Sequence, residues 1–204
     1  CWRTLGHEIM ILVFGKTGQV ATELQRLGNV VALGRDQADL SHPRACADAI
    51  RTHRPRAVIN AAAYTAVDRA EGEEALATII NGDAPTAMAH ACVELGIPLV
   101  HISTDYVFEG TRDAPWQPDD PTAPQNAYGR SKWAAEIGIR DSGAAHAILR
   151  TSWVVSAHGT NFVKTMLRLS ETRDALTVVA DQIGGPTPAS DIAEACLQMA
   201  DCNV

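Results

Sequence analysis

The chain of 204 residues lacks several features that would assign it to other classes of protein. It has no basic excess, because its formal net charge is -7 at pH 7, whereas a surface for nucleic acid or an anionic membrane would need a basic footprint. It has no apolar run long enough to cross a membrane. Its five cysteines form no CxxC motif and no metal-site spacing. We therefore expect reduced thiols in a cytoplasmic protein, with neither nucleic acid nor membrane as a partner.

The N-terminal segment is too polar and too short for the apolar core of a signal peptide. Because Met10 immediately precedes the first strand-like run, we interpret residues 1–9 as a possible vector-derived or upstream extension. The rest of the chain contains no internal repeat and no low-complexity tract. Its length suits one well-buried domain with a small appendage.

Short apolar runs alternate with helical patterns along the chain, and this alternation is typical of βαβ units and a parallel sheet. The predicted strands are 10–14, 30–33, 57–60, 99–103, 147–150 and 176–179. The predicted helices are 20–27, 43–53, 84–95, 128–140 and 161–171. The segment 109–125 contains four prolines and is predicted to be a loop outside the sheet. The fold class predicted is α/β, with a Rossmann-like doubly wound parallel sheet.

The turn after the first strand carries small residues at Gly15, Gly18 and Ala21. This GxxGxxA spacing permits a tight turn and a close approach of the backbone to a phosphate at the N-terminus of the next helix. It differs from the GxGxxG dinucleotide fingerprint, and three small residues are also compatible with a simple sharp turn. Its position directly after the first strand favours the cofactor interpretation.

The ends of the second and third strands supply further cofactor candidates. Arg35, after the second strand, suits the 2′-phosphate of NADP, although a surface arginine beside Asp36 is an almost equally good interpretation. NADPH is therefore the expected cofactor, with NADH possible. Other residues are expected to open onto the same crevice, where small side chains let a flat ring lie against the backbone: Asp39, Leu40, Ala61, Ala62 and Ala63.

Two further patterns indicate chemistry. Tyr128 and Lys132 are four residues apart, which puts a phenol and an ammonium on one face of a helix. Such a pair is also common on solvated helices, so the spacing alone is weak evidence. The fourth strand ends in Ser103, Thr104 and Asp105, and ligands of open α/β sheets bind at the carboxyl ends of the strands.

Together these stretches resemble the dTDP-4-dehydrorhamnose reductase family of the extended short-chain dehydrogenase/reductase superfamily. The matching stretches are FGKTGQV at 14–20, NAAAYTAVDRAE at 60–71, STDYVF at 103–108, YGRSK at 128–132, RTSW at 150–153 and DQIGGPT at 181–187. The resemblance covers residues 10 to about 200. Several ordered motifs of this kind are hard to obtain by chance.

The resemblance implies NADPH-dependent reduction of the 4-keto group of a dTDP-linked 6-deoxyhexulose to dTDP-L-rhamnose. Tyr128 would be the general acid, Lys132 would hold the nicotinamide ribose and lower the pKa of Tyr128, and Thr104 would bind the carbonyl oxygen. The implied sugar contacts are Val67, Thr104, Asp105, Tyr106, Tyr128 and Trp153. The implied cofactor contacts are Gly15, Lys16, Thr17, Gly18, Gln19, Val20, Arg35, Asp39, Leu40, Ala61, Ala62, Ala63, Tyr64, Tyr128 and Lys132. No metal site is predicted.

Members of this family are longer than this chain. The resemblance therefore implies an NAD(P)-binding domain at 10–180, followed at 181–204 by the start of a truncated substrate-binding lobe. A homodimer is expected if the missing C-terminal part is present. Two alternatives remain open: a non-catalytic NADP-binding regulatory subunit similar to the beta subunit of methionine adenosyltransferase, and a nucleotide-sugar epimerase or dehydratase with tightly held NAD.

Overall fold

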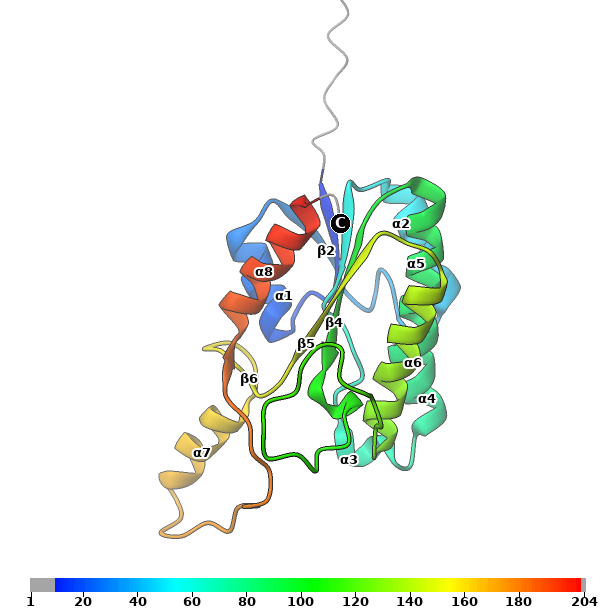
Figure 1. The fold of residues 1–204 in the computed structure, drawn as a ribbon. Coiled ribbons are helices and arrows are strands. Elements are labelled where there is room, and N and C mark those ends of the chain that lie inside the picture. The colour runs from blue at the N-terminus through cyan, green and yellow to red at the C-terminus, as the bar shows by residue number, and fades with distance from the viewer. Residues whose placement is uncertain (1–9, 203–204) are drawn as a thin grey trace, which may run out of the picture.

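The computed structural model describes residues 10–202, which form a parallel sheet covered by helices on both faces (Figure 1). The extension predicted at 1–9 lies outside the described residues. The sheet contains β1 (Ile11–Phe14), β2 (Val30–Leu33), β3 (Ala57–Asn60), β4 (Leu99–Thr104) and β5 (His146–Thr151). Their order is β2-β1-β3-β4-β5, and all neighbouring pairs are parallel. The predicted doubly wound α/β fold is confirmed.

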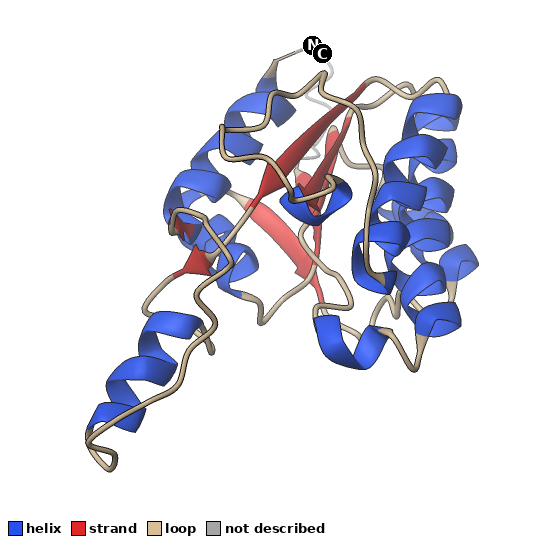
Figure 2. Cartoon of the chain, turned by 60° about the horizontal axis from the view of Figure 1, so that its bottom comes forward, coloured by secondary structure: helices blue, strands red, loops and turns tan. Residues whose placement is uncertain are grey.

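Helices α1 (Gln19–Leu27) and α8 (Ala189–Asp201) cover one face of the sheet, and α2 (Pro43–His53), α5 (Ala84–Leu95) and α6 (Ala127–Asp141) cover the other. Figure 2 shows these two layers on opposite sides of the strands. A sheet buried on both faces explains why its strands are continuous apolar runs rather than alternating patterns.

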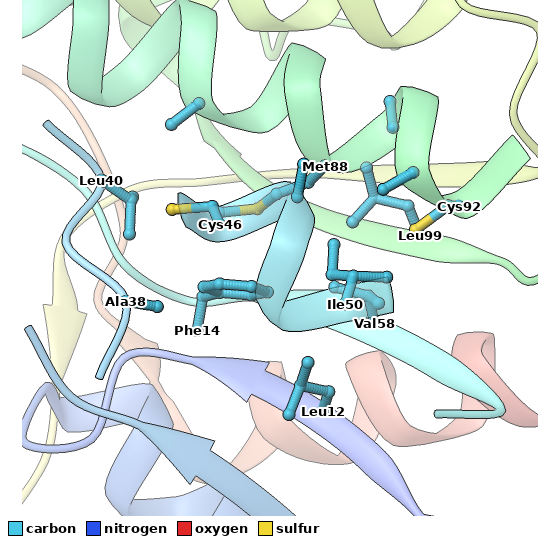
Figure 3. Packing of buried hydrophobic residues seen from close by; sticks show 14 of the residues in the cluster. Leu12, Phe14, Ala38, Leu40, Cys46, Ile50, Val58, Met88, Cys92 and Leu99 are labelled. Carbon is cyan, nitrogen blue, oxygen red and sulfur yellow. The ribbon is translucent and has the colours of Figure 1, made fainter. Parts of the chain in front are cut away.

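Successive residues of β1 supply the two halves of the core. Ile11 and Val13 pack under α1 and α8, whereas Leu12 and Phe14 pack against α2 and α5. Figure 3 shows Leu12 and Phe14 among the side chains of the half of the core on the α2 and α5 side, which includes Ile50. This alternation follows from the two-residue period of a strand. It places β1, between β2 and β3, with its C-terminal turn held between two packed layers.

The helix ends follow local sequence signals. Pro43 occupies the first turn of α2, and Gly96 ends α5 in the left-handed conformation with φ +65°. Asn126 caps α6 by accepting a hydrogen bond from the backbone N–H of Gly129 at 2.7 Å. The predicted helix boundaries are therefore close to those observed.

Between β3 and α5 the chain forms α3 (Val67–Ala70), α4 (Glu74–Thr78) and a π-helical turn, η1 (Ile79–Asp83). A 3-10 turn, η2 (Asp105–Val107), follows β4, and the proline-rich segment 109–125 forms an irregular loop as predicted. Within residues 10–202, no helix is long and apolar enough to cross a membrane.

The region after β5 differs most from the prediction. It contains α7 (Phe162–Ser170) and a small parallel pair, β6 (Val154–Val155) with β7 (Thr187–Pro188). The strand predicted at 176–179 is wrong, because these residues are irregular and exposed, with Val179 64% accessible. A β-branched apolar run favours a strand only where a neighbouring strand can pair with it. Conversely, α8 was not predicted, although Ile192, Ala193 and Cys196 form its buried stripe.

Candidate active site

A cavity of about 840 Å³ opens outside the carboxyl ends of the parallel strands. The order of the sheet reverses at β1, which has β2 on one side and β3 on the other, and this switch point is where ligands of doubly wound folds bind. Every residue predicted to bind cofactor or substrate, or to take part in the reaction, lines this cavity except Tyr64. The volume is in the range of small-molecule sites.

The β1–α1 turn forms one end of the cavity. Gly15 has φ +106°, and a Cβ there would lie 3.2 Å from the carbonyl oxygen of Ala61. Only glycine combines this backbone conformation with such a close contact. Gly18, the N-cap of α1, provides no side-chain cap, and the first turn of the helix has no acidic residue. The N-terminus of α1 is therefore suited to an anionic group such as a phosphate.

Gln19 connects this turn with the region after β5. Its side-chain oxygen accepts hydrogen bonds from Ser156 Oγ at 3.0 Å and from Asn161 Nδ2 at 2.9 Å, and its Nε2 donates to the carbonyl of Val154 at 3.4 Å. A residue predicted to bind cofactor thus also anchors the segment that borders the cavity on that side.

Tyr64 is not among the residues that line the cavity, so its placement differs from the prediction. Its hydroxyl donates to Glu73 at 2.8 Å, and its backbone N–H donates to Asn81 Oδ1 at 2.8 Å. Asn81 also donates to Ser131 Oγ on α6 at 3.0 Å. Sequence reasoning missed Asn81, whose signal was a polar residue inside an apolar helical run. It ties the loop after β3 to α6.

Tyr128 lies in the first turn of α6, beside the end of β4. Gly129 makes this possible, because a Cβ there would collide with the carbonyl oxygen of Tyr106. The rings of Tyr106 and Tyr128 pack edge to face, with their centroids 5.7 Å apart. Burial raises the pKa of Tyr128 to about 12; a hydrogen bond with Thr104 opposes this shift and the charge of Asp105 adds to it. The phenol therefore stays protonated at neutral pH.

Lys132 is buried at the floor of the cavity, with 2% of its surface exposed. Its Nζ donates to the carbonyl oxygen of Ile102 at 2.6 Å and lies 3.1 Å from His101 Nε2. Burial lowers the pKa of Lys132 to about 7, while the charge of Glu136 opposes this shift. In the free chain desolvation of the phenol has the largest effect on the pKa of Tyr128 and raises it, so the lowering expected from Lys132 stays a prediction.

A second buried charge lies one helical turn further along α6. Glu136 accepts two hydrogen bonds from Arg150, at 2.6 and 2.9 Å, and one from Ser103 Oγ at 2.7 Å. Burial raises the pKa of Glu136, but the hydrogen bonds from Arg150 and Ser103 outweigh it, so the net shift is downward. Arg150 also donates to the carbonyl of Pro118 and lies over the ring of Phe108. Glu136, which sequence reasoning missed, therefore orients the arginine that holds the proline-rich loop.

Trp153 stands at the rim of the cavity. Its φ of +48° is unusual for a bulky residue. Its ring packs edge to face against the ring of Phe162, with the two centroids 5.5 Å apart. A second cavity of about 1150 Å³ lies between the proline-rich loop and residues 181–187, and it shares Asp105, Thr151 and Ser152 with the first. In residues 10–202, no group of three His, Cys, Asp or Glu side chains is arranged to hold a metal ion.

The motif-based resemblance is confirmed by comparison with known proteins. Residues 9–204 match the family model described as RmlD substrate binding domain. The chain is 48% identical over 192 residues to dTDP-4-dehydrorhamnose reductase of Salmonella typhimurium, and the alignment covers 90% of this chain and 64% of that protein. It is 48% identical over 188 residues to the Burkholderia thailandensis reductase, covering 90% of this chain and 63% of that one.

A solved structure agrees with these matches. The dTDP-4-dehydrorhamnose reductase of Bacillus anthracis, in complex with NADP, superposes with a TM-score of 0.91 at 36% identity, covering 96% of this chain and 71% of that one. The chain thus spans less than two thirds of the length of the Salmonella and Burkholderia relatives. Because the family model matches nearly the whole chain, this protein belongs to the RmlD substrate binding domain family.

Proposed function

We propose that the protein reduces the 4-keto group of a dTDP-linked 6-deoxyhexulose to give dTDP-L-rhamnose, with NADPH as the reductant. The observation that carries this proposal is the single cavity that joins Thr104, Tyr128 and Lys132 to the glycine turn at Gly15 and Gly18. A hydride donor held by the turn can therefore reach a carbonyl held at the other end. The relatives that bear this name, and the neighbour solved with NADP, support the assignment.

The residues of the cavity fit a dinucleotide. The N-terminus of α1, with no side-chain cap, suits the pyrophosphate, and the exposed Arg35 lies on the cavity wall where a 2′-phosphate could pair with it. Ala61, Ala62 and Ala63 leave room for a flat ring against the backbone. When bound, the cofactor would supply the hydride. We infer a preference for NADPH over NADH from Arg35.

Tyr128 is the general acid of the proposed reaction. Because its pKa is raised to about 12, its hydroxyl is protonated at neutral pH and can donate to the oxygen that becomes a hydroxyl group. Thr104, which lines the cavity with Tyr128, binds the carbonyl oxygen, and Tyr106, whose ring packs edge to face against Tyr128, borders the sugar. Val67, Asp105 and Trp153 border the space left for the sugar.

The nucleotide part of the substrate is assigned to the second cavity. Residues 181–187 and the proline-rich loop form its walls, and it meets the first cavity at Asp105, Thr151 and Ser152. We propose that residues 10–180 hold the cofactor while the segment from 181 onward contributes to the substrate lobe. A homodimer remains part of the proposal for a chain that includes the C-terminal region. A cytoplasmic location is also proposed, and the four described cysteines, which are free thiols, support it.

The direct test is oxidation of NADPH by the purified chain with and without the dTDP-linked 4-keto sugar, with NADH as the comparison. Substrate-dependent oxidation that favours NADPH supports the proposal. NADPH binding without turnover would fit either a truncated enzyme or the regulatory alternative, and the same assay on a chain extended by the C-terminal part of its relatives would decide between them. NAD retained through purification would point to an epimerase or dehydratase.

A further inference from the structure

A row of polar side chains lies between β4 and α6, where an apolar interface would be expected. His101 and Ser103 point from alternate positions of β4 toward α6, and they meet Lys132 and Glu136. Asn60 is directly opposite His101 in the register of β3 and β4, so the two side chains lie on the same face of the sheet. Asn60 Nδ2 is 3.1 Å from His101 Nδ1. Both residues are 1% exposed.

These contacts form one continuous chain of hydrogen bonds with fixed ends. At one end the backbone N–H of Ala62, which can only donate, points at Asn60 Oδ1 at 3.2 Å. At the other end the carbonyl oxygen of Ile102, which can only accept, is 2.6 Å from Lys132 Nζ. Between these ends lie Asn60, His101 and Lys132.

The fixed ends determine the direction of every bond between them. Because Asn60 Oδ1 accepts from the backbone, its amide nitrogen faces the ring and donates to His101 Nδ1. The imidazole then carries its proton on Nε2, which donates to Lys132 Nζ. An ammonium has no lone pair and could not accept this bond. The opposite direction would turn the amide nitrogen of Asn60 toward the partly buried N–H of Ala62, so that two donors would face each other with no acceptor between them.

We propose that Asn60 and His101 are positioning residues that hold Lys132 as a neutral amine in the free protein, with His101 Nε2–H donating to Nζ. One N–H of the amine is then used by Ile102, and the other is directed into the cavity. Because the hydrogen bonds with His101 and Ile102 fix the orientation of the amine, the remaining N–H is oriented to donate to a ligand hydroxyl.

The surrounding charges are compatible with this arrangement. Burial lowers the pKa of Lys132 to about 7, and burial together with Lys132 lowers the pKa of His101 well below its ordinary value. The groups that face Lys132 are His101 from β4, Glu136 and Tyr128 from its own helix, and Asp105 from η2 at the cavity. Glu136 favours an ammonium, but two arginines already neutralise it. Tyr128 is uncharged at neutral pH because its pKa is raised.

The first experiment observes the tautomer of His101 by nitrogen NMR of the free chain, with His101→Gln used only to assign the signal. The expected spectrum shows a neutral ring protonated at Nε2 from pH 8 to pH 9, the range in which Lys132 is a neutral amine. A ring protonated at Nδ1, or an imidazolium in this range, would overturn the proposal. This measurement needs no cofactor or substrate, so it stands even if the proposed reductase activity fails.

The second experiment follows the ε-carbon of Lys132 in lysine-labelled protein, where Lys16 and Lys164 provide the only other lysine signals. The Lys132 signal is expected to titrate near pH 7. Asn60→Asp keeps the shape and the acceptor for Ala62, but its carboxylate accepts from Nδ1–H and reverses the chain. We expect the tautomer to switch and the midpoint of Lys132 to rise by about one pH unit or more. An unchanged tautomer in folded Asn60→Asp contradicts the proposal.

The effect on turnover rests on the proposed function. In Asn60→Asp the pH profile of NADPH-dependent reduction should move to higher pH together with the Lys132 midpoint measured by NMR. A merely structural role for Asn60 would change the rate without moving the profile. A profile that stays in place while the NMR midpoint moves would reject the role of this network in the reaction.

Discussion

Helices α6 and α7 both carry apolar and polar residues at helical spacing, yet they differ in what they bury. α6 packs against β4 and buries its inner face, including Lys132 and Glu136. α7 has no buried residue, and Leu167 on its apolar side is 64% exposed. Figure 1 shows α7 away from the sheet, at the end of a projecting segment. An amphipathic pattern therefore shows which face of a helix can be buried. Whether that face is buried depends on the presence of a neighbouring apolar surface to pack against it.

The residues of the proposed reaction lie on the helix that is packed. Tyr128 and Lys132 are fixed by α6 and its neighbours, whereas α7 depends on its cap and on the bonds between Asn161 and Gln19. Elements with few buried contacts open at lower free energy than the core. We therefore expect changes in α6 to alter the reaction or the global stability, and changes near α7 to act locally.

The largest expected effect is on turnover. Tyr128→Phe removes the proton donor but keeps the ring, so the rate of reduction should fall by roughly 10²- to 10⁴-fold. NADPH binding, measured by titration of cofactor fluorescence, should be little changed. Retained turnover would remove Tyr128 from the acid role.

The next effect is on global stability. Glu136→Gln leaves Arg150 without a carboxylate partner, and we expect a loss of about 3 kcal/mol or more in the urea unfolding free energy at pH 7. The matched control is Glu94→Gln, which breaks an exposed pair with Arg51 and should have a much smaller effect.

The pH dependence of Glu136→Gln provides a separate check. The pKa of Glu136 is lowered in the folded chain, so its contribution is complete above the ordinary value of 4.5 and is lost as the pH falls through the folded pKa. The difference in unfolding free energy between variant and wild type should therefore become smaller below pH 4.5. A gap that is constant with pH would attribute the loss to packing rather than to charge.

Lys132→Met is expected to show a pH dependence of the same direction in a higher pH range. The folded pKa of Lys132, about 7, is below its ordinary 10.5, so from pH 10.5 down to 7 the unfolded chain binds more protons and wild-type stability decreases. Relative to wild type, the variant should gain on the order of 3 kcal/mol between pH 10 and pH 7. Unfolding curves at both pH values check this, and Lys164→Met is the exposed control. An equal difference at both pH values would contradict the neutral buried amine.

The smallest effect should be local. Asn161→Ala removes the cap of α7 and its bond to Gln19, which together stabilise this segment by about 1 kcal/mol. Hydrogen exchange should become faster in residues 154–170 and stay unchanged in β1 and β4. Faster exchange across the whole sheet would mean that α7 is coupled to the core more tightly than its exposure suggests. Ile183→Ser, at a residue 91% exposed, is the surface control.

The layers of the fold and the location of the candidate site could be predicted from local sequence patterns. Buried parallel strands must be apolar on both faces, and Gly15 is needed where the backbone adopts φ +106° against Ala61, so both leave local signals. The spacing of Tyr128 and Lys132 likewise predicts a shared helical face. These features depend on neighbours a few residues away in the chain.

The protonation of the buried groups and the packing of the C-terminal segments depend on contacts between distant parts of the chain. His101 and Asn60 meet Lys132 from two different strands, and this burial, rather than the four-residue spacing, gives the lysine its low pKa. The turn of Tyr64 toward Glu73, the burial of α8 and the exposure of 176–179 also depend on distant partners. Desolvation and strand pairing are properties of surroundings assembled from the whole chain, so no local pattern reports them.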